Sequence, residues 1–454
     1  MLSPTTRQIL TLAFPLLLGQ LGNITVSFAD NIMVGHYSTE ALASASFVNN
    51  VFNIAILACL GFTNGLTPLV GALFVKGSKA EIGRLVRVGL RVNLLFCLAV
   101  LALMGAVYFN VHRMSQPDEL LPIIRPYFLT VAAGIVWVTV FSVFAQWCYA
   151  INRTGLPTWI LLTANGLNII GNYALIYGRF GCPELGLTGA GISTLVARAL
   201  SALAMAWVFF RSPFARDYCR GFFRAPAARG EVKKVVATGF PVAMQSTFET
   251  ASFSGCAVMA GWLGAISLAA YQIVMISGMM GFCIYFSFAA AMAIPISHAA
   301  GRGDNAAMRR TAWAGYRIIL IIMVAVCVIL LTCGRHIMSL FSSDPDVVAL
   351  SVSLLIPMAL YQFGDATQMC FGNALRGTSR VMPMLYIAFV SYVVVGLPLS
   401  YAFGFPLGGG LCGIVLSFTV CLLLAAALYL RYFLRTTRPD NHPLKLHKLY
   451  SLPL

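Results

Sequence analysis

The chain has 454 residues, of which 59% are hydrophobic and only 10% are charged, and its mean hydropathy is +0.84. Soluble domains carry about 25% charged residues, so this composition excludes a soluble enzyme held by a single anchor. It indicates a polytopic membrane protein. The formal net charge of +16 would also suit a nucleic-acid-binding protein, and the positions of the basic residues decide between the two readings.

Apolar windows of about 20 residues, the length that crosses the hydrocarbon core of a bilayer, predict twelve membrane spans. The first is expected to be a retained helix, because the residues before it lack a signal-peptide n-region and a small-residue cleavage site. The predicted spans are residues 8–32, 46–74, 88–110, 122–146, 157–178, 187–210, 234–260, 266–297, 312–332, 347–372, 381–403 and 409–432.

The basic residues gather on one side of this predicted topology. The N-terminus, the even-numbered connections and the C-terminal tail hold 25 of the 30 Lys and Arg residues, whereas the odd-numbered connections hold four. Both termini are therefore expected in the cytoplasm. The surplus of positive charge is a topology signal, and no nucleic-acid partner is expected. The remaining basic residue, Arg198, falls inside the sixth span.

The twelve cysteines occur singly, with no C-x-x-C pair and no Cys/His spacing typical of a zinc site. Most fall inside predicted spans, where a free cysteine behaves as a small hydrophobic residue. We therefore predict neither a disulfide framework nor a zinc site.

Two halves of the chain resemble each other. Phe14-Pro15 recurs 226 residues later as Phe240-Pro241, and Leu42-Ala43 recurs at the same offset as Leu268-Ala269. An even number of spans in each half gives both copies the same orientation, as in transporters built from parallel repeats. Pro15 and Pro241 are either tolerated membrane prolines or bends that let a helix flex.

The expected organisation follows from this duplication. An N-lobe covers residues 1–210, a basic cytoplasmic linker covers 211–233, a C-lobe covers 234–433, and a short basic cytoplasmic tail covers 434–454.

Three carboxylates lie within predicted spans, namely Asp30, Glu249 and Asp365, while the other eleven acids lie in loops or at span ends. Ionisable residues at membrane depth normally face the bundle interior or a water-filled cavity. Such a group can exchange a proton near neutral pH, or trade it for Na⁺ where neutral oxygens complete the shell. Three acids whose spans contain no basic residue at depth favour a cation site over three structural acids, although a structural role remains the alternative for each one.

Polar neighbours support this hypothesis. Tyr361 lies four residues before Asp365 and shares its helical face, and Ser246 and Ser252 flank Glu249 at three residues on either side. A stripe of asparagines at 165, 168 and 172 follows one face of the fifth span, and serves either ion coordination or helix packing. Arg198 is either a counter-charge for Asp30 or a residue that snorkels, so we leave it out of the predicted site.

The sequence resembles the multidrug and toxic compound extrusion (MATE) family in its NorM-like branch, over about residues 7–433. The carriers are AFPLLLGQLGNITVSFADNIMVGHYSTEALAS in the first span and loop, GFPVAMQSTFETASF in the seventh, QFGDATQMCFGNALRGTSR in the tenth, and NIIGN and GAGIST in the fifth and sixth. The resemblance implies an all-α exporter of twelve transmembrane helices, in two pseudo-symmetric six-helix lobes around a central cavity, in the bacterial inner membrane.

The resemblance also implies the site residues. The family's N-lobe acid falls on Asp30, its asparagines on Asn168 and Asn172, and its threonine on Thr194. The C-lobe acids of the branch fall on Glu249 and Asp365, with the tyrosine one turn earlier on Tyr361, and these three would hold Na⁺ if Na⁺ is used. The fifth-span aspartate of the DinF-like branch has no counterpart here, which favours the NorM-like assignment.

The expected function is secondary active export of amphipathic, often cationic, small molecules against inward Na⁺ or H⁺, by alternating access and without a cofactor. The alternative is a flippase or exporter of a lipid-linked saccharide or another specific metabolite. No enzymatic activity and no catalytic residue are expected, because the GxGD string at residues 301–304 lies in a basic loop and no HExxH occurs. Membrane lipid is an expected partner. We expect a monomer, although no sequence pattern bears on oligomeric state.

Overall fold

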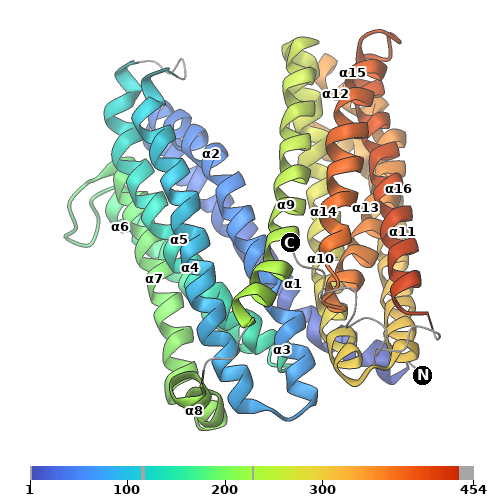
Figure 1. Cartoon of the computed structure of the whole chain (residues 1–454). Coiled ribbons are helices and arrows are strands. Elements are labelled where there is room, and N and C mark those ends of the chain that lie inside the picture. The colour runs from blue at the N-terminus through green and yellow to red at the C-terminus, as the bar shows by residue number, and fades with distance from the viewer. Residues whose placement is uncertain (1–2, 114–117, 227–229, 439–454) are drawn as a thin grey trace. The chain divides into compact units, whose positions relative to one another are not determined.

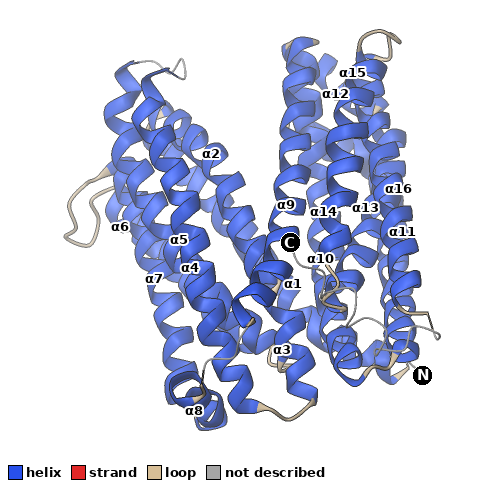
Figure 2. Ribbon diagram, viewed as in Figure 1, coloured by secondary structure: helices blue, strands red, loops and turns tan. Residues whose placement is uncertain are grey.

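The structure is a computed structural model of the whole chain, and it describes residues 3–113, 118–226 and 230–438. Over these residues the chain is almost entirely helical and contains no strand (Figure 2). The all-α fold predicted from the sequence is confirmed.

The described residues of the first half form eight α-helices (Figure 1), with short 3₁₀ turns between α4 and α5 and between α7 and α8. They are α1 (Pro4–Tyr37), α2 (Thr39–Asn64), α3 (Leu66–Val75), α4 (Lys79–Asn110), α5 (Leu121–Ala150), α6 (Gly155–Ile176), α7 (Gly186–Arg211) and α8 (Arg216–Arg224). The second half contains α9 (Glu231–Trp262), α10 (Ala265–Arg302), α11 (Asn305–Ser339), α12 (Pro345–Ser353), α13 (Leu355–Gly377), α14 (Met382–Ala388), the π-helical segment η4 (Phe389–Gly396), α15 (Leu397–Gly404) and α16 (Gly410–Thr436).

Nine of the twelve predicted spans fall within one of these helices or within a run of consecutive ones. The other three, residues 157–178, 381–403 and 409–432, extend past an end of α6, α14 and α16 by one or two residues. Among the described residues, ten helical segments are long and apolar enough to cross a membrane, or eleven when α12 and α13, bent by 49° at Leu354, count as one span. The remaining predicted span lies in α9. With 32 residues this helix is long enough to cross a membrane, but it is not among the segments that are also apolar enough. Its polar run Gln245–Thr250 lowers the hydropathy at the middle of the helix.

The helices form two compact units. One, here called the N unit, consists of Leu18–Ala243, and the other, the C unit, consists of Met1–Leu17 together with Met244–Leu454. The chain therefore passes from one unit to the other inside α1 and inside α9, in each case two residues after a helix proline, Pro15 or Pro241. These bounds differ from the expected lobes at the start of α1 and the start of α9.

The start of α9 belongs to the N unit because it packs closely on the α2–α3 junction. A Cβ atom at Gly65 would lie 2.7 Å from the backbone of Gly239, so only glycine permits this approach. Equivalent helix pairs pack within each unit, since α2 packs on α5 as α10 packs on α13, and α5 packs on α7 as α13 packs on α16.

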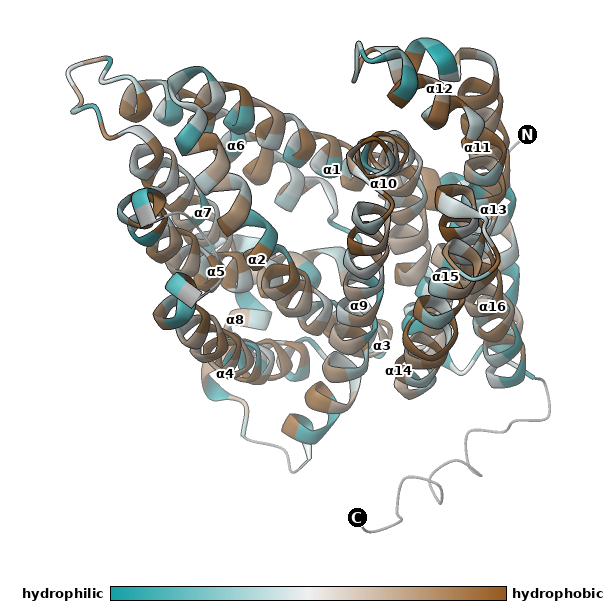
Figure 3. Cartoon of the chain, turned by 90° about the horizontal axis from the view of Figure 1, so that it is seen from above, coloured by the Kyte–Doolittle hydropathy of each residue, from teal (hydrophilic) through white to brown (hydrophobic). Residues whose placement is uncertain are grey.

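The apolar outer surface repeats as well. The large exposed side chains of α4 include Leu95, Leu98 and Leu103, and those of α11 include Ile321, Val324 and Ile329, each 226 residues later. Figure 3 shows hydrophobic residues along most helices of both units. Exposed apolar surface of this extent marks contact with another apolar phase, and the repeat places lipid-facing surface on corresponding helices.

Two ion pairs of the N unit differ sharply in burial. Arg84 Nε contacts Glu231 Oε1 at 2.8 Å with side chains only 15% and 11% exposed, whereas Lys79 Nζ contacts Asp217 Oδ2 at 2.9 Å with both about half exposed. The hydrogen bond from Lys79 lowers the pKa of Asp217 below its ordinary value.

We expect Arg84→Ala to lower the free energy of unfolding by about 2 kcal/mol, because it leaves a nearly buried Glu231 without its cation. Lys79→Ala serves as the control, with an expected loss below about 1 kcal/mol. Thermal unfolding of the detergent-solubilised protein measures both, and equal losses in the two variants would contradict the prediction.

Candidate functional site

The C unit contains the carboxylates Glu249, on α9, and Asp365, on α13. Asp365 is only 2% exposed and Glu249 is half-buried. Gln368, one turn after Asp365 on α13, donates its Nε2 hydrogen to Glu249 Oε1 at 3.4 Å. Asp365 Oδ2 has no hydrogen-bond partner among the described residues, and no ion pair to either acid occurs there. The two carboxylates lie close enough for their charges to interact.

Phenol groups surround the two carboxylates. Tyr361 lies near both acids, and its ring packs edge-on against Phe253 at 6.5 Å. Tyr392 and Tyr429 lie near Glu249, and Tyr285 lies near Asp365. All four tyrosines are buried. The Tyr392 hydroxyl interacts with the Glu249 carboxylate, whereas the hydroxyls of Tyr285 and Tyr429 have no hydrogen-bond partner in the described part of the chain.

This group of oxygens suits a hard monovalent cation or a proton, because it combines two carboxylates with neutral phenol and amide oxygens. In the described ranges, no cluster of three or more His, Cys, Asp or Glu side chains has the arrangement of a metal site. Neutral oxygens would therefore have to complete the shell around any ion held by Glu249 and Asp365. Buried polar groups are nearly always paired, so the unpartnered hydroxyls of Tyr285 and Tyr429 make this place a candidate site.

The N unit brings Asp30, Asn168, Asn172 and Thr194 together from α1, α6 and α7. Asn172 Nδ2 donates to Asp30 Oδ1. With the Asn168 amide in the orientation that satisfies both of its ends, its nitrogen donates to Asp30 Oδ1 at 3.2 Å and its oxygen accepts from the Thr194 hydroxyl at 3.1 Å. Two amides therefore hold one carboxylate, and the threonine orients one of the amides.

Asp30 differs from the acids of the C unit because it has a basic neighbour. The Arg198 guanidinium, on α7, interacts electrostatically with Asp30 and with Tyr127 of α5. It lies against Gly134, where an added Cβ would come within 2.8 Å of Arg198 Nη1, and that nitrogen has no hydrogen-bond partner among the described residues. Arg198 thus faces the interior of the N unit beside Asp30.

Some polar neighbours expected from the sequence have other partners. Ser252 donates to the backbone oxygen of Tyr392 at 3.3 Å instead of to Glu249, and Asn165 donates to Asn23 at 3.4 Å. Sequence reasoning missed Gln368, although its position three residues after Asp365 on one helix face was a usable signal. It also missed Tyr392 and Tyr429, which come from distant segments and carry no such signal.

Comparison with known proteins decides the family. A family model described as MatE matches residues 15–174 and again residues 241–402. The chain belongs to the MATE family. The double match confirms the predicted duplication, because its two starts are separated by the offset at which the Phe-Pro pairs recur.

Several MATE relatives align over nearly the whole chain. The Probable multidrug resistance protein NorM of Bradyrhizobium diazoefficiens is 30% identical over 438 residues, which cover 93% of this chain and 92% of the relative. The Multidrug resistance protein MdtK of Yersinia pseudotuberculosis is 28% identical over 403 residues, which cover 88% and 87%. These names agree with the NorM-like resemblance seen in the sequence.

Solved structures confirm the MATE fold. A MOP superfamily transporter from Pyrococcus furiosus superposes with a TM-score of 0.87 at 17% identity, covering 96% of each chain. A eukaryotic MATE transporter superposes with a TM-score of 0.84 at 17% identity, covering 96% of this chain and 98% of that one. MATE proteins are transporters and not enzymes, so the protein is a multi-pass membrane transporter.

Proposed function

We propose that the protein exports amphipathic, often cationic, small molecules in exchange for inward Na⁺ or H⁺, by alternating access of its sites to the two sides of the membrane. The two relatives described above are named multidrug resistance proteins, and both align with more than 85% of this chain. This similarity supports drug-type export, and the two acidic sites support cation coupling.

The single observation that carries the coupling is the pair Glu249 and Asp365. Two carboxylates that interact in a buried place repel each other when both are ionised. Binding one cation, either a proton or Na⁺, removes this repulsion, and releasing the cation restores it. A group that alternates in this way lets an ion gradient drive a change of conformation.

In this proposal Glu249, Asp365 and Tyr361 hold the coupling ion, and Asp30 with Asn168, Asn172 and Thr194 does the corresponding work in the N unit. Reciprocal linkage then requires that ion and exported compound oppose each other's binding. The proposed setting is the bacterial inner membrane, with both termini in the cytoplasm and the protein working as a monomer.

Efflux from proteoliposomes tests the coupling, with the Na⁺ gradient and the pH gradient imposed separately. We expect accumulation of a fluorescent organic cation against its gradient under one of the two, and its collapse when an ionophore removes that gradient. Transport that depends on neither gradient would overturn the proposal of a secondary exporter.

A further inference from the structure

The short helix α8 (Arg216–Arg224) is fixed tightly to the start of α4. A Cβ at Gly83 would lie 1.9 Å from the backbone oxygen of Tyr218, and a Cβ at Gly221 would lie 2.2 Å from that of Ala80. The two glycines therefore let the backbones of the two helices meet. In Figure 1, α8 is seen nearly end-on at the foot of α7, so its axis runs across α7 and not along it.

One face of α8 is a row of arginines. Arg216, Arg220 and Arg224 follow one another at intervals of four residues, so they share a helix face, and all three are exposed. None of them forms an ion pair among the described residues. Asp217, the acid within the helix, is paired with Lys79 and interacts with Arg216 and Arg220 only through weaker electrostatic attraction. We call these three residues the arginine row.

Aromatic residues adjoin the row. Phe223 is 66% exposed, and its ring packs at 5.6 Å from that of Phe210, in the last turn of α7. Trp207, one turn earlier on α7, is exposed to the same extent. Aromatic rings beside arginines on a helix lying across a transmembrane helix are typical of an element in the membrane interface.

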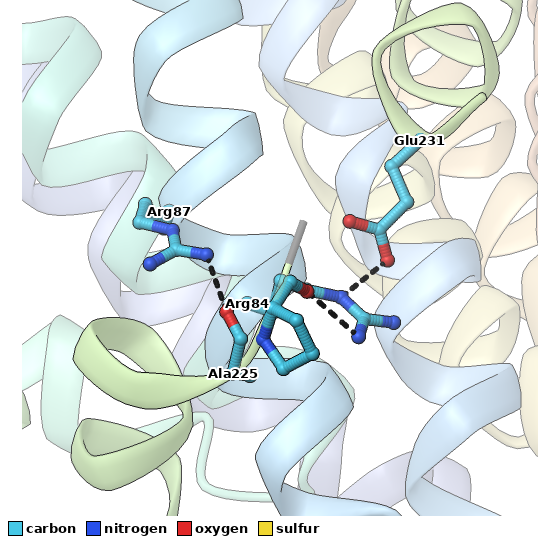
Figure 4. A network of polar contacts seen from close by, with 5 residues as sticks. Arg84, Arg87, Ala225 and Glu231 are labelled. Atoms are coloured by element: carbon cyan, nitrogen blue, oxygen red, sulfur yellow. Dashed lines mark hydrogen bonds and ion pairs between the residues drawn. The ribbon is translucent and has the colours of Figure 1, made fainter. Parts of the chain in front are cut away.

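The position of α8 is also fixed at its C-terminal end. Arg87, on α4, donates to the backbone oxygen of Phe223 at 3.3 Å. It also donates to that of Ala225 at 2.8 Å (Figure 4), and Arg84 donates to that of Pro226 at 3.1 Å. Arg84 also pairs with Glu231, the first residue of α9. Two arginines of α4 therefore connect α8 to the start of α9, the helix that carries Glu249. The arginine row has no ion pair among the described residues.

We propose that the arginine row binds the headgroups of anionic phospholipids in the membrane leaflet that faces it. Three guanidinium groups on a rigid helix, flanked by exposed aromatic rings, complement a phosphate-bearing headgroup with acyl chains beside it. Arg84 joins the end of this segment, at Pro226, to Glu231 at the start of α9. The proposal rests on the membrane placement of α8 and is independent of which compound is exported.

Affinity for a fluorescent phosphatidylglycerol, measured on the full-length protein in neutral detergent, tests the proposal. Each arginine near an anionic lipid surface contributes about fivefold in affinity, so the R216Q/R220Q/R224Q variant is expected to bind on the order of a hundredfold more weakly. The R216K/R220K/R224K variant keeps the charge and is expected to stay within about threefold of the parent. Phosphatidylcholine is expected to bind weakly to all three proteins.

The matched control removes three exposed arginines of the C unit, in R302Q/R310Q/R431Q, and its affinity is expected to change by less than about threefold. Equal losses in the two triple glutamine variants would overturn the proposal, because general charge would then account for binding. Competition by inorganic phosphate as effective as that by unlabelled phosphatidylglycerol would also overturn it. Because the readout is lipid binding, a failure of export would leave this result unaffected.

Discussion

Replacing Glu249 by Gln, or Asp365 by Asn, is expected to reduce ion-driven efflux to the level of protein-free vesicles. Each substitution keeps the shape of the side chain but removes the charge that the coupling ion neutralises. With one permanently neutral partner, the other carboxylate no longer experiences the repulsion that makes binding and release of a cation drive the cycle. Efflux of a fluorescent cation from proteoliposomes measures the effect.

A matched control is available in the first turn of α12. Asp346 is exposed and lies outside the candidate site, so Asp346→Asn removes the same charge and is expected to leave efflux unchanged. Normal efflux in both Glu249→Gln and Asp365→Asn, at equal amounts of protein in the membrane, would exclude the C-unit acids as the coupling site.

The stability of these variants separates a functional role from a structural one. Asp365 is buried, and its Oδ2 atom has no partner among the described residues, so a neutral amide at this position costs less to bury than an ionised carboxylate. Asp365→Asn is therefore expected to unfold at the same temperature as the parent or at a higher one. A residue kept at the expense of stability indicates selection for function.

The sequence was sufficient to predict most of the fold because each helix that crosses a membrane needs a long run of apolar residues. The predicted span 234–260 lies in α9 even though polar residues around Glu249 interrupt its apolar run. The bend at Leu354 leaves no mark in hydropathy, because the helix stays apolar on both sides of it. The crossing of the chain between units inside α1 and α9 likewise follows from packing and not from composition.

The candidate site was predictable to the extent that its members share one helix or one motif. Tyr361 and Asp365 are one turn apart, and Asn168 and Asn172 follow the same rule on α6, so spacing alone placed each pair on one face. Tyr392 lies in the π-helical segment η4, where the usual helical periodicity does not hold, and its approach to Glu249 depends on tertiary packing. The side chain of Arg198 points toward Asp30 only because of how α7 is oriented about its own axis, and the sequence does not give that orientation.

The placement of Arg198 beside Asp30 makes the two acidic sites chemically unequal. A fixed guanidinium competes with any cation that approaches Asp30, whereas no ion pair holds Glu249 or Asp365 among the described residues. At an effective dielectric constant of about 20, a unit charge several ångströms away contributes on the order of 1–2 kcal/mol, or about tenfold in cation affinity. The N-unit site should therefore hold a cation more weakly than it would without Arg198.

In this proposal the exported organic cation and the coupling ion compete for the Asp30 carboxylate. Arg198→Gln is consequently expected to tighten binding of a fluorescent organic cation by about tenfold and to slow its efflux, because release becomes limiting. Asp30→Asn is expected to weaken binding by a similar factor. In the double variant the effect of the arginine should largely disappear, which gives a coupling energy of about 1 kcal/mol in a double-mutant cycle. Arg198→Lys keeps the charge and should resemble the parent.

Equilibrium binding in detergent, followed by fluorescence polarisation, measures the parent and the four variants together with the control Arg125→Gln. Arg125 is an exposed arginine on α5 of the same unit, and its loss is expected to leave binding unchanged. If Arg198→Gln had the same effect in the presence and in the absence of the Asp30 carboxylate, the two residues would act independently. Arg198 would then serve the packing of α7 against Gly134, and the asymmetry between the two units would need another cause.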